Sequence, residues 1–322
     1  AASDVYKRQA IDPYGHELWR WTFPVNKLNQ QTEQLSPLSS RPAYTETENE
    51  LTVKANKRTF IFSKKDGQLK GVSVDNRKIN FANGPRFIGA RRADRSLDQF
   101  YNHDDEKAKE KDRTYSEFPD AAVFTKLDVK QDGGDLIVTA NYKLGNLDKA
   151  QWTINPSGDL ALDYTYNFSG VVDLMGIRFD YPEDQVISKR WLGAGPYRVW
   201  QNRIHGTQYD VWENDYNDPI PGETFTYPEF KGYFGNVSWM NIQTKEGTIS
   251  LTNETPDTYI GVYQPRDGRD RLLYTLPESE ISVLNVIPPV RNKVNSTDLC
   301  GPSSQPKWVN GPQTGRVIFR FM

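Results

Sequence analysis

The chain of 322 residues has 40 basic and 42 acidic side chains and a net charge of −2, which gives no electrostatic reason to expect binding to nucleic acid or to a membrane surface. No apolar run approaches the length that spans a membrane. The single cysteine, Cys300, excludes an internal disulfide and a cysteine-based metal site, and the three histidines are scattered along the chain, so we expect no metal and no cofactor.

The first nine residues resemble the translation of an adaptor used in sequencing libraries. We therefore expect residues 1–9 to be a non-native tail that is disordered and dispensable, and we leave them out of the reasoning about the fold. The reading frame would then open inside a longer gene, so the lack of a signal peptide carries no information. The alternative is a genuine N-terminal tail.

The segment at residues 10–25 begins with a turn signal, D-P-Y-G, and continues as a strand. Its residues alternate at 18–23, with Trp19 and Trp21 on one face. Such a strand needs a sheet to join. The polar residues that follow, 26–43, are rich in Gln, Ser and Pro and are expected to form a linker.

The remainder of the chain, residues 44–322, has the pattern of β-structure almost throughout. Residues 136–142 alternate, and in residues 160–168 five large apolar side chains alternate with smaller or polar ones. No segment shows a convincing helical period, turn signals recur, and there is no internal repeat. The sequence therefore predicts an all-β chain dominated by one large antiparallel β-sandwich.

Aromatic residues concentrate in one stretch of this region. Between Trp191 and Trp239 there are 12 aromatic residues in 49, whereas the whole chain has 12%. Planar hydrogen-bonding side chains are interspersed among them. Rings that pack on C–H groups, together with guanidinium, amide and carboxylate groups that bind hydroxyls, suit a sugar ligand. The alternative is that most of these rings belong to the core of the sandwich, because aromatic residues favour strands.

The beginning of this stretch carries a family resemblance. Residues 191–203, W-L-G-A-G-P-Y-R-V-W-Q-N-R, resemble the signature W-x-G-x-G-P-x-E-x-Y-x-D-R of family 2 glycoside hydrolases, which lies in the C-terminal β-sandwich of β-galactosidases. Three positions depart from the signature: Arg198 replaces Glu, Trp200 replaces Tyr and Asn202 replaces Asp. The segments that follow are similar to a subgroup common in gut Bacteroidetes. The positions that match are Trp191, Gly193, Gly195, Pro196 and Arg203.

The resemblance implies a galactose-mutarotase-like supersandwich for residues 44–322, preceded at residues 10–25 by the last strand of an immunoglobulin-like domain. It also implies that both catalytic glutamates lie in a (β/α)₈ barrel on the N-terminal side, and this chain lacks the alternating strand–helix pattern of such a barrel. We therefore expect no catalytic residue here. The candidate carbohydrate-binding residues are Tyr197, Arg198, Trp200, Asn202, Arg203, Trp212 and Trp308.

Trp308 enters that set because of a departure from the family. Well-known β-galactosidases place a tryptophan before a Leu-Asn pair in a late strand, where it stacks on the galactoside. Val283 stands at the comparable position here. Either another ring, such as Trp308, covers the sugar, or the substrate is not a simple β-galactoside.

Two local expectations follow from the signature. Gly193, Gly195 and Pro196 should form a tight turn at the end of the Trp191 strand, because glycine permits positive φ and proline fixes the exit, and the turn should aim the next residues at one edge of the sandwich. Arg203 should make ordered hydrogen bonds to a ligand, or else pair structurally with Asp210 or Asp215. A charged insertion, residues 88–113, adds Arg91, Arg92 and Asp94 as candidates or forms a solvated loop.

These observations favour one function: a C-terminal carbohydrate-binding domain that shapes the active-site rim of a β-galactosidase-like glycoside hydrolase acting on plant or host glycans. Its partners would be an oligosaccharide or polysaccharide and the N-terminal domains of the same polypeptide, in a bacterial periplasm or secreted. One alternative is a free-standing carbohydrate-binding or epimerase-like module, for which His205 and Glu229 are the pairing nearest the signature. Another is a packing domain without sugar contacts.

Overall fold

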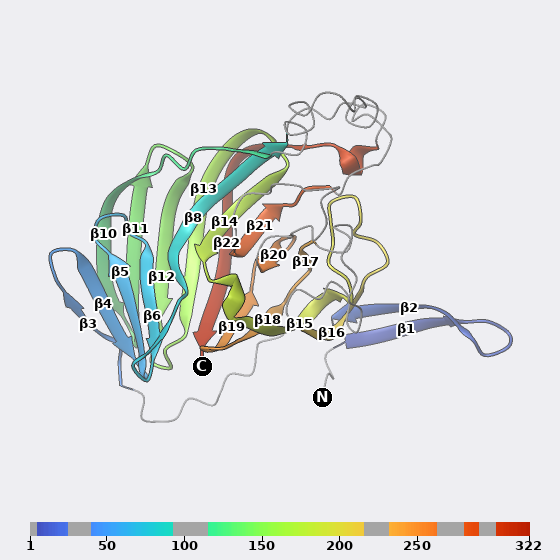
Figure 1. The fold of residues 1–322 in the computed structure, drawn as a ribbon, viewed down its shortest axis with the longest axis horizontal. Coiled ribbons are helices and arrows are strands. Elements are labelled where there is room, and N and C mark those ends of the chain that lie inside the picture. Colours follow the sequence, from blue (N-terminus) through green and yellow to red (C-terminus); the bar gives the residue numbers. More distant parts are fainter. Residues whose placement is uncertain (1–4, 25–39, 93–114, 216–231, 263–279, 290–300) are drawn as a thin grey trace.

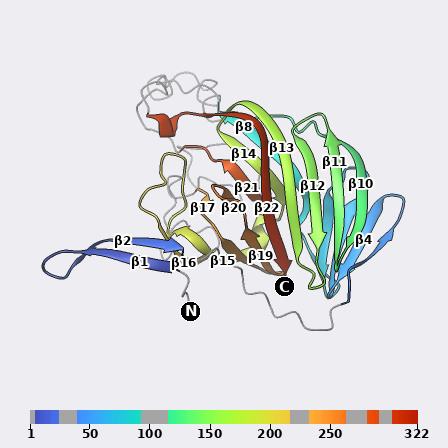
Figure 2. The ribbon, with the colours of Figure 1, turned by 180° about the vertical axis from the view of Figure 1, so that it is seen from behind.

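The computed structural model describes residues 5–24, 40–92, 115–215, 232–262, 280–289 and 301–322. Within these ranges the chain is built from strands and two short 3-10 helices, η1 (Glu183–Gln185) and η4 (Pro302–Ser304). Two large sheets pack face to face, and a separate two-stranded hairpin projects from one end of the sandwich in both views (Figures 1 and 2). No helix in the described residues is long and apolar enough to cross a membrane.

The first sheet has nine strands, and β13 and β22 lie in front in the view of Figure 2. β13 and β22, distant in sequence, pair over their length near its middle. Its order is β10 (Val123–Asp132), β11 (Asp135–Lys143), β12 (Leu147–Ile154), β13 (Leu160–Val172), β22 (Lys307–Phe321), β19 (Gly247–Asn253), β18 (Trp239–Thr244), β15 (Val186–Gly195) and β16 (Gln208–Asp215).

The second sheet has eleven strands. Two of them lie off the main path: β7 (Arg77–Ile79) pairs with β6, and β9 (Tyr115–Glu117) pairs with β8. Its order is β17 (Phe234–Gly235), β20 (Tyr259–Val262), β21 (Ile281–Val286), β14 (Leu174–Asp180), β8 (Ala82–Arg92), β6 (Leu69–Val74), β5 (Arg58–Ser63), β4 (Glu50–Ala55) and β3 (Ala43–Glu46).

Every strand pair in the described residues is antiparallel, so the all-β antiparallel sandwich that the sequence predicts is confirmed. The main core lies between the sheets and follows the predicted alternation. In β13, Leu160, Leu162, Tyr164 and Tyr166 are buried in it, while Asn167 is exposed. One face of each strand therefore provides the core, as the period of two requires.

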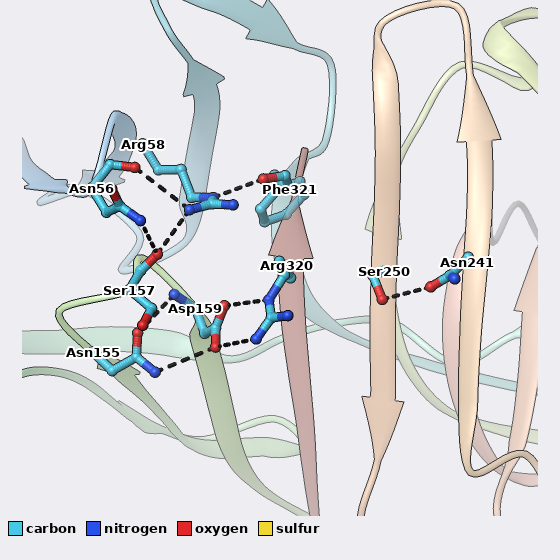
Figure 3. Close-up of polar contacts among 9 residues, drawn as sticks. All are labelled: Asn56, Arg58, Asn155, Ser157, Asp159, Asn241, Ser250, Arg320 and Phe321. Atoms are coloured by element: carbon cyan, nitrogen blue, oxygen red, sulfur yellow. Dashed lines mark hydrogen bonds and ion pairs between the residues drawn. The ribbon is translucent and has the colours of Figure 1, made fainter. Parts of the chain in front are cut away.

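A polar network joins the end of the C-terminal strand, β22 of the nine-stranded sheet, to the eleven-stranded sheet (Figure 3). The guanidinium of Arg320 in β22 donates two hydrogen bonds of 2.7 Å to the carboxylate of Asp159, which lies just before β13. Arg58 in β5 donates from Nε to the carbonyl of Phe321 at 2.7 Å and from Nη1 to that of Ser157 at 2.8 Å. Both side chains of the Arg320–Asp159 pair are largely buried, at 15% and 14% exposed. The network therefore ties strands of both sheets together.

The projecting hairpin corrects one expectation. β2 (Glu17–Pro24) contains the strand predicted at residues 18–23, but its partner is β1 (Val5–Ile11), so residues 5–9 are strand rather than disordered. The reason is local: the carboxylate of Asp12 accepts hydrogen bonds from the backbone N–H groups of Tyr14 and His16, both at 2.8 Å, and closes the turn that brings the strands together. That residues 1–9 are non-native stays a prediction.

The hairpin rests on the edge strand β16 through its polar face. Lys7 pairs with Asp210 at 2.6 Å, and the backbone N–H of Tyr209 donates to Oγ1 of Thr22 at 2.7 Å. Trp19 and Trp21 lie on the other face and are about half exposed. The predicted origin of residues 10–25 in an immunoglobulin-like domain, and the linker at residues 26–43, most of which lies outside the described residues, stay predictions.

Candidate carbohydrate-binding site

The signature at residues 191–203 begins inside the sandwich. Trp191 in β15 is fully buried in the main core, where its ring meets that of Phe234 edge-on at 4.8 Å between centroids. Its indole N–H donates to the carbonyl of Ala194 at 3.0 Å. The first residue of the signature therefore belongs to the core of the sandwich.

The two signature glycines do not form the expected turn. β15 runs through Gly195, and neither glycine has a positive φ. They are needed for close approach instead: a Cβ at Gly193 would lie 3.0 Å from the carbonyl oxygen of Asn236, and one at Gly195 would lie 2.4 Å from Cδ1 of Trp212. The chain leaves the strand only at Pro196. The physical reason is that a glycine in a strand interior also serves to admit a neighbouring ring or backbone.

After Pro196 the signature packs on the outer face of the eleven-stranded sheet. The backbones of Val199 and Tyr233 pair with each other through hydrogen bonds of 2.7 and 2.9 Å, and the rings of Trp200 and Tyr233 meet edge-on at 5.7 Å. Residues that alternate with main-core positions in β8 and β21 complete a second cluster, which we name the satellite core. Its members are Ile88, Ala90, Tyr115, Leu174, Val199, Trp200, Tyr233, Leu284 and Ile287.

This packing corrects the placement of three candidate residues. Trp200 is 3% exposed within the satellite core, and Arg198, also 3% exposed, holds its guanidinium 5.1 Å from the centroid of the Phe234 ring. Trp212 is partly buried, covers Gly195 and donates to the carbonyl of Gly193 at 3.2 Å. These side chains support the surface rather than form it, because aromatic and guanidinium groups in this stretch also fill a core.

The next two residues bind a distant part of the chain. The side-chain amide of Gln201 donates to the carbonyls of Ser303 and Gln305 at 2.9 and 2.6 Å, and the amide of Asn202 donates to Oγ of Ser304 at 3.2 Å. We call residues 301–306, which contain η4 and lead into β22, the strap. η4 lies beside the segment that joins β15 to β16 in both ribbon views (Figures 1 and 2).

The remaining candidate residues lie at the surface around this junction. Trp308, the second residue of β22 and just after the strap, is 72% exposed, Tyr197 is 38% exposed, and Arg203 is exposed. Asn202 is partly buried against the strap. The structure thus leaves Tyr197 and Arg203 at the surface, at the two ends of a segment whose middle is buried, and ties that segment to the strand that carries Trp308.

Arg203 does not make the structural ion pair that was one of its two expected roles. Among the described residues, Asp210 pairs with Lys7 instead. No hydrogen bond or ion pair in the described part of the chain joins the guanidinium of Arg203 to the carboxylate of Asp210 or of Asp215. The backbone of Arg203 closes a turn with Trp200, with its N–H donating to the Trp200 carbonyl at 2.8 Å. Its guanidinium is therefore held at the surface by the main chain.

The structure also places the other candidates from the sequence. Val283 is 2% exposed in the main core, so its side chain faces the interior of the sandwich and not a surface ligand. Neighbouring Asn285 accepts a hydrogen bond of 2.6 Å from Tyr166. His205 is exposed, whereas Glu229 lies outside the described residues. No group of three metal-ligating side chains occurs in the part of the chain that the structure describes.

A charged strip on the same outer face escaped the sequence reasoning. Arg86 in β8 and Arg178 in β14 stand opposite each other across the strand pair, and acids balance them: Asp180 pairs with Arg86, and Glu117 lies 3.8 Å from Arg178. Burial raises the pKa of Asp120 above its ordinary value, although these guanidinium groups oppose the shift. The pattern that could have indicated this strip is an arginine at alternate positions to the core residues of an otherwise apolar strand.

The charged insertion reaches the described residues only at its start. Arg91 continues β8 beyond this strip, is exposed, and pairs in register with Ser116 of β9. The side chain of Arg92 and all of Asp94 lie outside the described residues. Arg91 therefore lies at the end of β8 that the satellite core covers, next to Ala90 of that core.

The family model described as beta galactosidase small chain matches residues 54–299. The chain belongs to this family. The match covers most of the chain, including the whole signature, so the resemblance of the C-terminal sandwich to that of β-galactosidases is confirmed. No curated protein matches this small-chain domain. The similarity to a Bacteroidetes subgroup stays a prediction.

Three solved structures similar to this small-chain domain are sugar epimerases or mutarotases by description. A galactose 1-epimerase from Lactobacillus acidophilus NCFM has 9% identity and a TM-score of 0.47, with 88% of this chain and 99% of that chain covered. A putative aldose 1-epimerase from Escherichia coli K12 has 12% identity and a TM-score of 0.38, covering 87% and 99%. A putative mutarotase from Salmonella typhimurium has 8% identity and a TM-score of 0.36, covering 89% and 94%.

Proposed function

We propose that this small-chain domain is the carbohydrate-binding, active-site-rim domain of a family 2 glycoside hydrolase of the β-galactosidase type, acting on plant or host glycans. The observation that carries the proposal is the indole of Trp308, 72% exposed on a strand whose start is fastened to the family signature. A pyranose suits an exposed indole, because its C–H face can pack on the ring while the indole N–H donates to a hydroxyl group.

Polar groups for sugar hydroxyls lie on the signature itself. Arg203 presents a guanidinium, which can donate to a hydroxyl oxygen, and Tyr197 presents a phenol, which can donate to or accept from a hydroxyl group. Ligand sites in general combine apolar contact with a few such fixed polar groups. The satellite core beneath them supplies rigidity, because Val199 and Trp200 are buried directly between the two exposed residues.

We propose that hydrolysis belongs to other domains of the same polypeptide, with the domain in the bacterial periplasm or secreted. Among the carboxylate pairs of this chain, Glu213 and Asp215 lie two residues apart in β16, exposed at the sheet edge. Glu213 lies 4.0 Å from Arg190 across the strand pair. Hydrolysis of a glycosidic bond needs two carboxylates that flank the bond, and an exposed pair on one strand edge does not by itself supply that arrangement.

A glycan array tests the proposal on the purified chain. We expect binding to a subset of plant or host oligosaccharides without turnover of aryl β-galactosides. Trp308→Ala should weaken that binding at least about tenfold, which corresponds to ~1.4 kcal/mol, with an unchanged thermal midpoint. The matched control is Tyr44→Ala, which removes a ring that is 47% exposed on the far edge strand β3.

Two outcomes would contradict the proposal. Binding that is unaffected by Trp308→Ala would remove the observation on which it stands. Turnover that persists in a clean preparation, and that Glu229→Gln abolishes, would instead favour an epimerase or hydrolase site on the sandwich itself.

A further inference from the structure

Gln201 occupies an unusual place for a polar side chain. It is 6% exposed, and its amide nitrogen donates to two backbone carbonyls of the strap, those of Ser303 and Gln305. Its own backbone N–H donates to the carbonyl of Pro288, just after β21, at 3.0 Å. One residue of the signature therefore joins three segments that are distant in sequence. Its side-chain oxygen is buried without a hydrogen-bond partner, so its fastening role rests entirely on the two N–H donors.

The strap is held both by hydrogen bonds of its own and by those from Gln201. Inside it, Ser304 donates from its backbone N–H to the carbonyl of Gly301 at 2.9 Å, and Gln305 donates to that of Pro302 at 3.2 Å. The carbonyls of Ser303 and Gln305 point instead at Gln201. These two hydrogen bonds, to the residues on either side of Ser304, hold the strap against the signature.

Trp308 stands where this anchoring matters most. The ladder between β13 and β22 ends at the pairs of Val171 with Trp308 and Val172 with Lys307, so Trp308 is one pair from the end of a sheet. Strand ends open more readily than strand centres, because fewer hydrogen bonds hold them. The indole is mostly exposed and belongs to the second residue of β22, so the direction from which the strap enters β22 affects where the ring stands.

We propose that Gln201 is a positioning residue for Trp308: it clamps the strap and thereby sets where the exposed indole stands relative to Tyr197 and Arg203. The contact of Asn202 with Ser304 is a second, weaker fastening of the same strap. This inference rests on the proposed function, since the platform that it aligns is one for the C–H face of a pyranoside. The inference gives a buried residue of the signature a role of its own, which is to hold the strap in place.

The first measurement needs no ligand. The eight tryptophans of the chain are labelled with 5-fluorotryptophan, and the fluorine resonance of Trp308 is assigned by Trp308→Phe. In Gln201→Leu we expect that resonance to shift and broaden, while those of Trp152 and Trp191 in the main core stay in place. The matched control is Gln131→Leu, which also removes an amide-to-carbonyl bond, the one to Asp135 at 2.9 Å in the β10–β11 turn. A Trp308 resonance that is unchanged in folded Gln201→Leu overturns the inference.

Ser304→Ala provides a milder variant in case Gln201→Leu does not fold. It removes only the hydroxyl that accepts from Asn202, so we expect a displacement of the Trp308 resonance in the same direction and of smaller size. An unchanged Trp308 resonance in Ser304→Ala, with Gln201→Leu unfolded, also overturns the inference. Because Trp308 carries its own resonance, neither variant needs to lower global stability to give a readable result.

The second measurement separates this inference from the proposed function. The strongest-binding oligosaccharide of the array is titrated into the unmodified protein and into Gln201→Leu. We expect its affinity to be about tenfold lower for Gln201→Leu, and to fall no further when Trp308→Ala is added to that variant. If no sugar perturbs Trp308 although Gln201→Leu displaces its resonance, the clamp stands and the proposed function fails. If the sugar perturbs Trp308 and binds both proteins equally, the proposed function stands and the clamp fails.

Discussion

Between the two sheets, buried side chains come from strands in which every second residue points inward, whereas the satellite core is assembled from strand ends and from the irregular parts of the signature. In the main core, Phe81 lies 4.9–5.3 Å from the rings of Phe179, Phe319 and Phe321. In the satellite core, Trp200 has one close ring neighbour among the described residues, Tyr233. The exposed candidates for ligand binding adjoin the second region, where a few individual contacts determine the geometry.

Replacing one tryptophan in each region gives the largest expected effects. Trp152→Ala empties a site in the main core beside Phe62 and Phe179, and we expect it to cost about 3–5 kcal/mol of unfolding free energy. Trp200→Ala should fall toward the lower end of that range, because irregular segments can collapse into the cavity. Urea unfolding measures both. An equal or larger loss at Trp200 would remove the contrast between the two cores.

A methyl group at Gly195 tests the close packing at the start of the signature. Gly195→Ala places a Cβ against the Trp212 ring, and overpacking of this kind costs about 1–3 kcal/mol. Gly134→Ala is the control, because its nearest contact is an ordinary 3.5 Å from Pro156. Thermal unfolding of the pair checks the prediction. If both variants melt alike, the signature glycine is there for another reason.

Alkaline pH compares a buried tyrosine in each region. Burial raises the pKa of Tyr166 in the main core and of Tyr233 in the satellite core well above the usual value. The unfolded chain releases these protons near pH 10 while the folded chain keeps them, so stability falls as pH rises above 10, by about 1.4 kcal/mol per pH unit for each group. Tyr233→Phe and Tyr166→Phe should each flatten the slope by that amount. A slope that only Tyr166→Phe changes would mean that the satellite core admits water.

Deletion of residues 1–9 should have the smallest effect. It removes most of β1 and the ion pair of Lys7 with Asp210, whose side chains are 40% and 23% exposed. Exposed pairs contribute at most about 1 kcal/mol, which moves the midpoint of a domain this large by ~2 °C. A shift of several degrees would show that the hairpin is an integral part of the fold.

The sequence predicts the main sandwich well because alternation over residues 160–168 specifies which side chains face the core. It predicts the satellite core poorly. Trp200 and Arg198 stand on no regular strand, so no period indicates that they are buried, and only Trp191 could be placed by its motif. The role of Gly195 depends on a ring 17 residues away, and that of Gln201 on carbonyls about 100 residues away. Such non-local contacts leave no local pattern.

Hydrogen exchange in the presence of the bound oligosaccharide tests most directly whether the surface beside the satellite core is the functional one. The account predicts slower exchange in the signature after Pro196 and in residues 301–310, with no change in β10–β12 at the far end of the nine-stranded sheet. Slower exchange confined to other strands, or equal protection in Trp308→Ala, would contradict it.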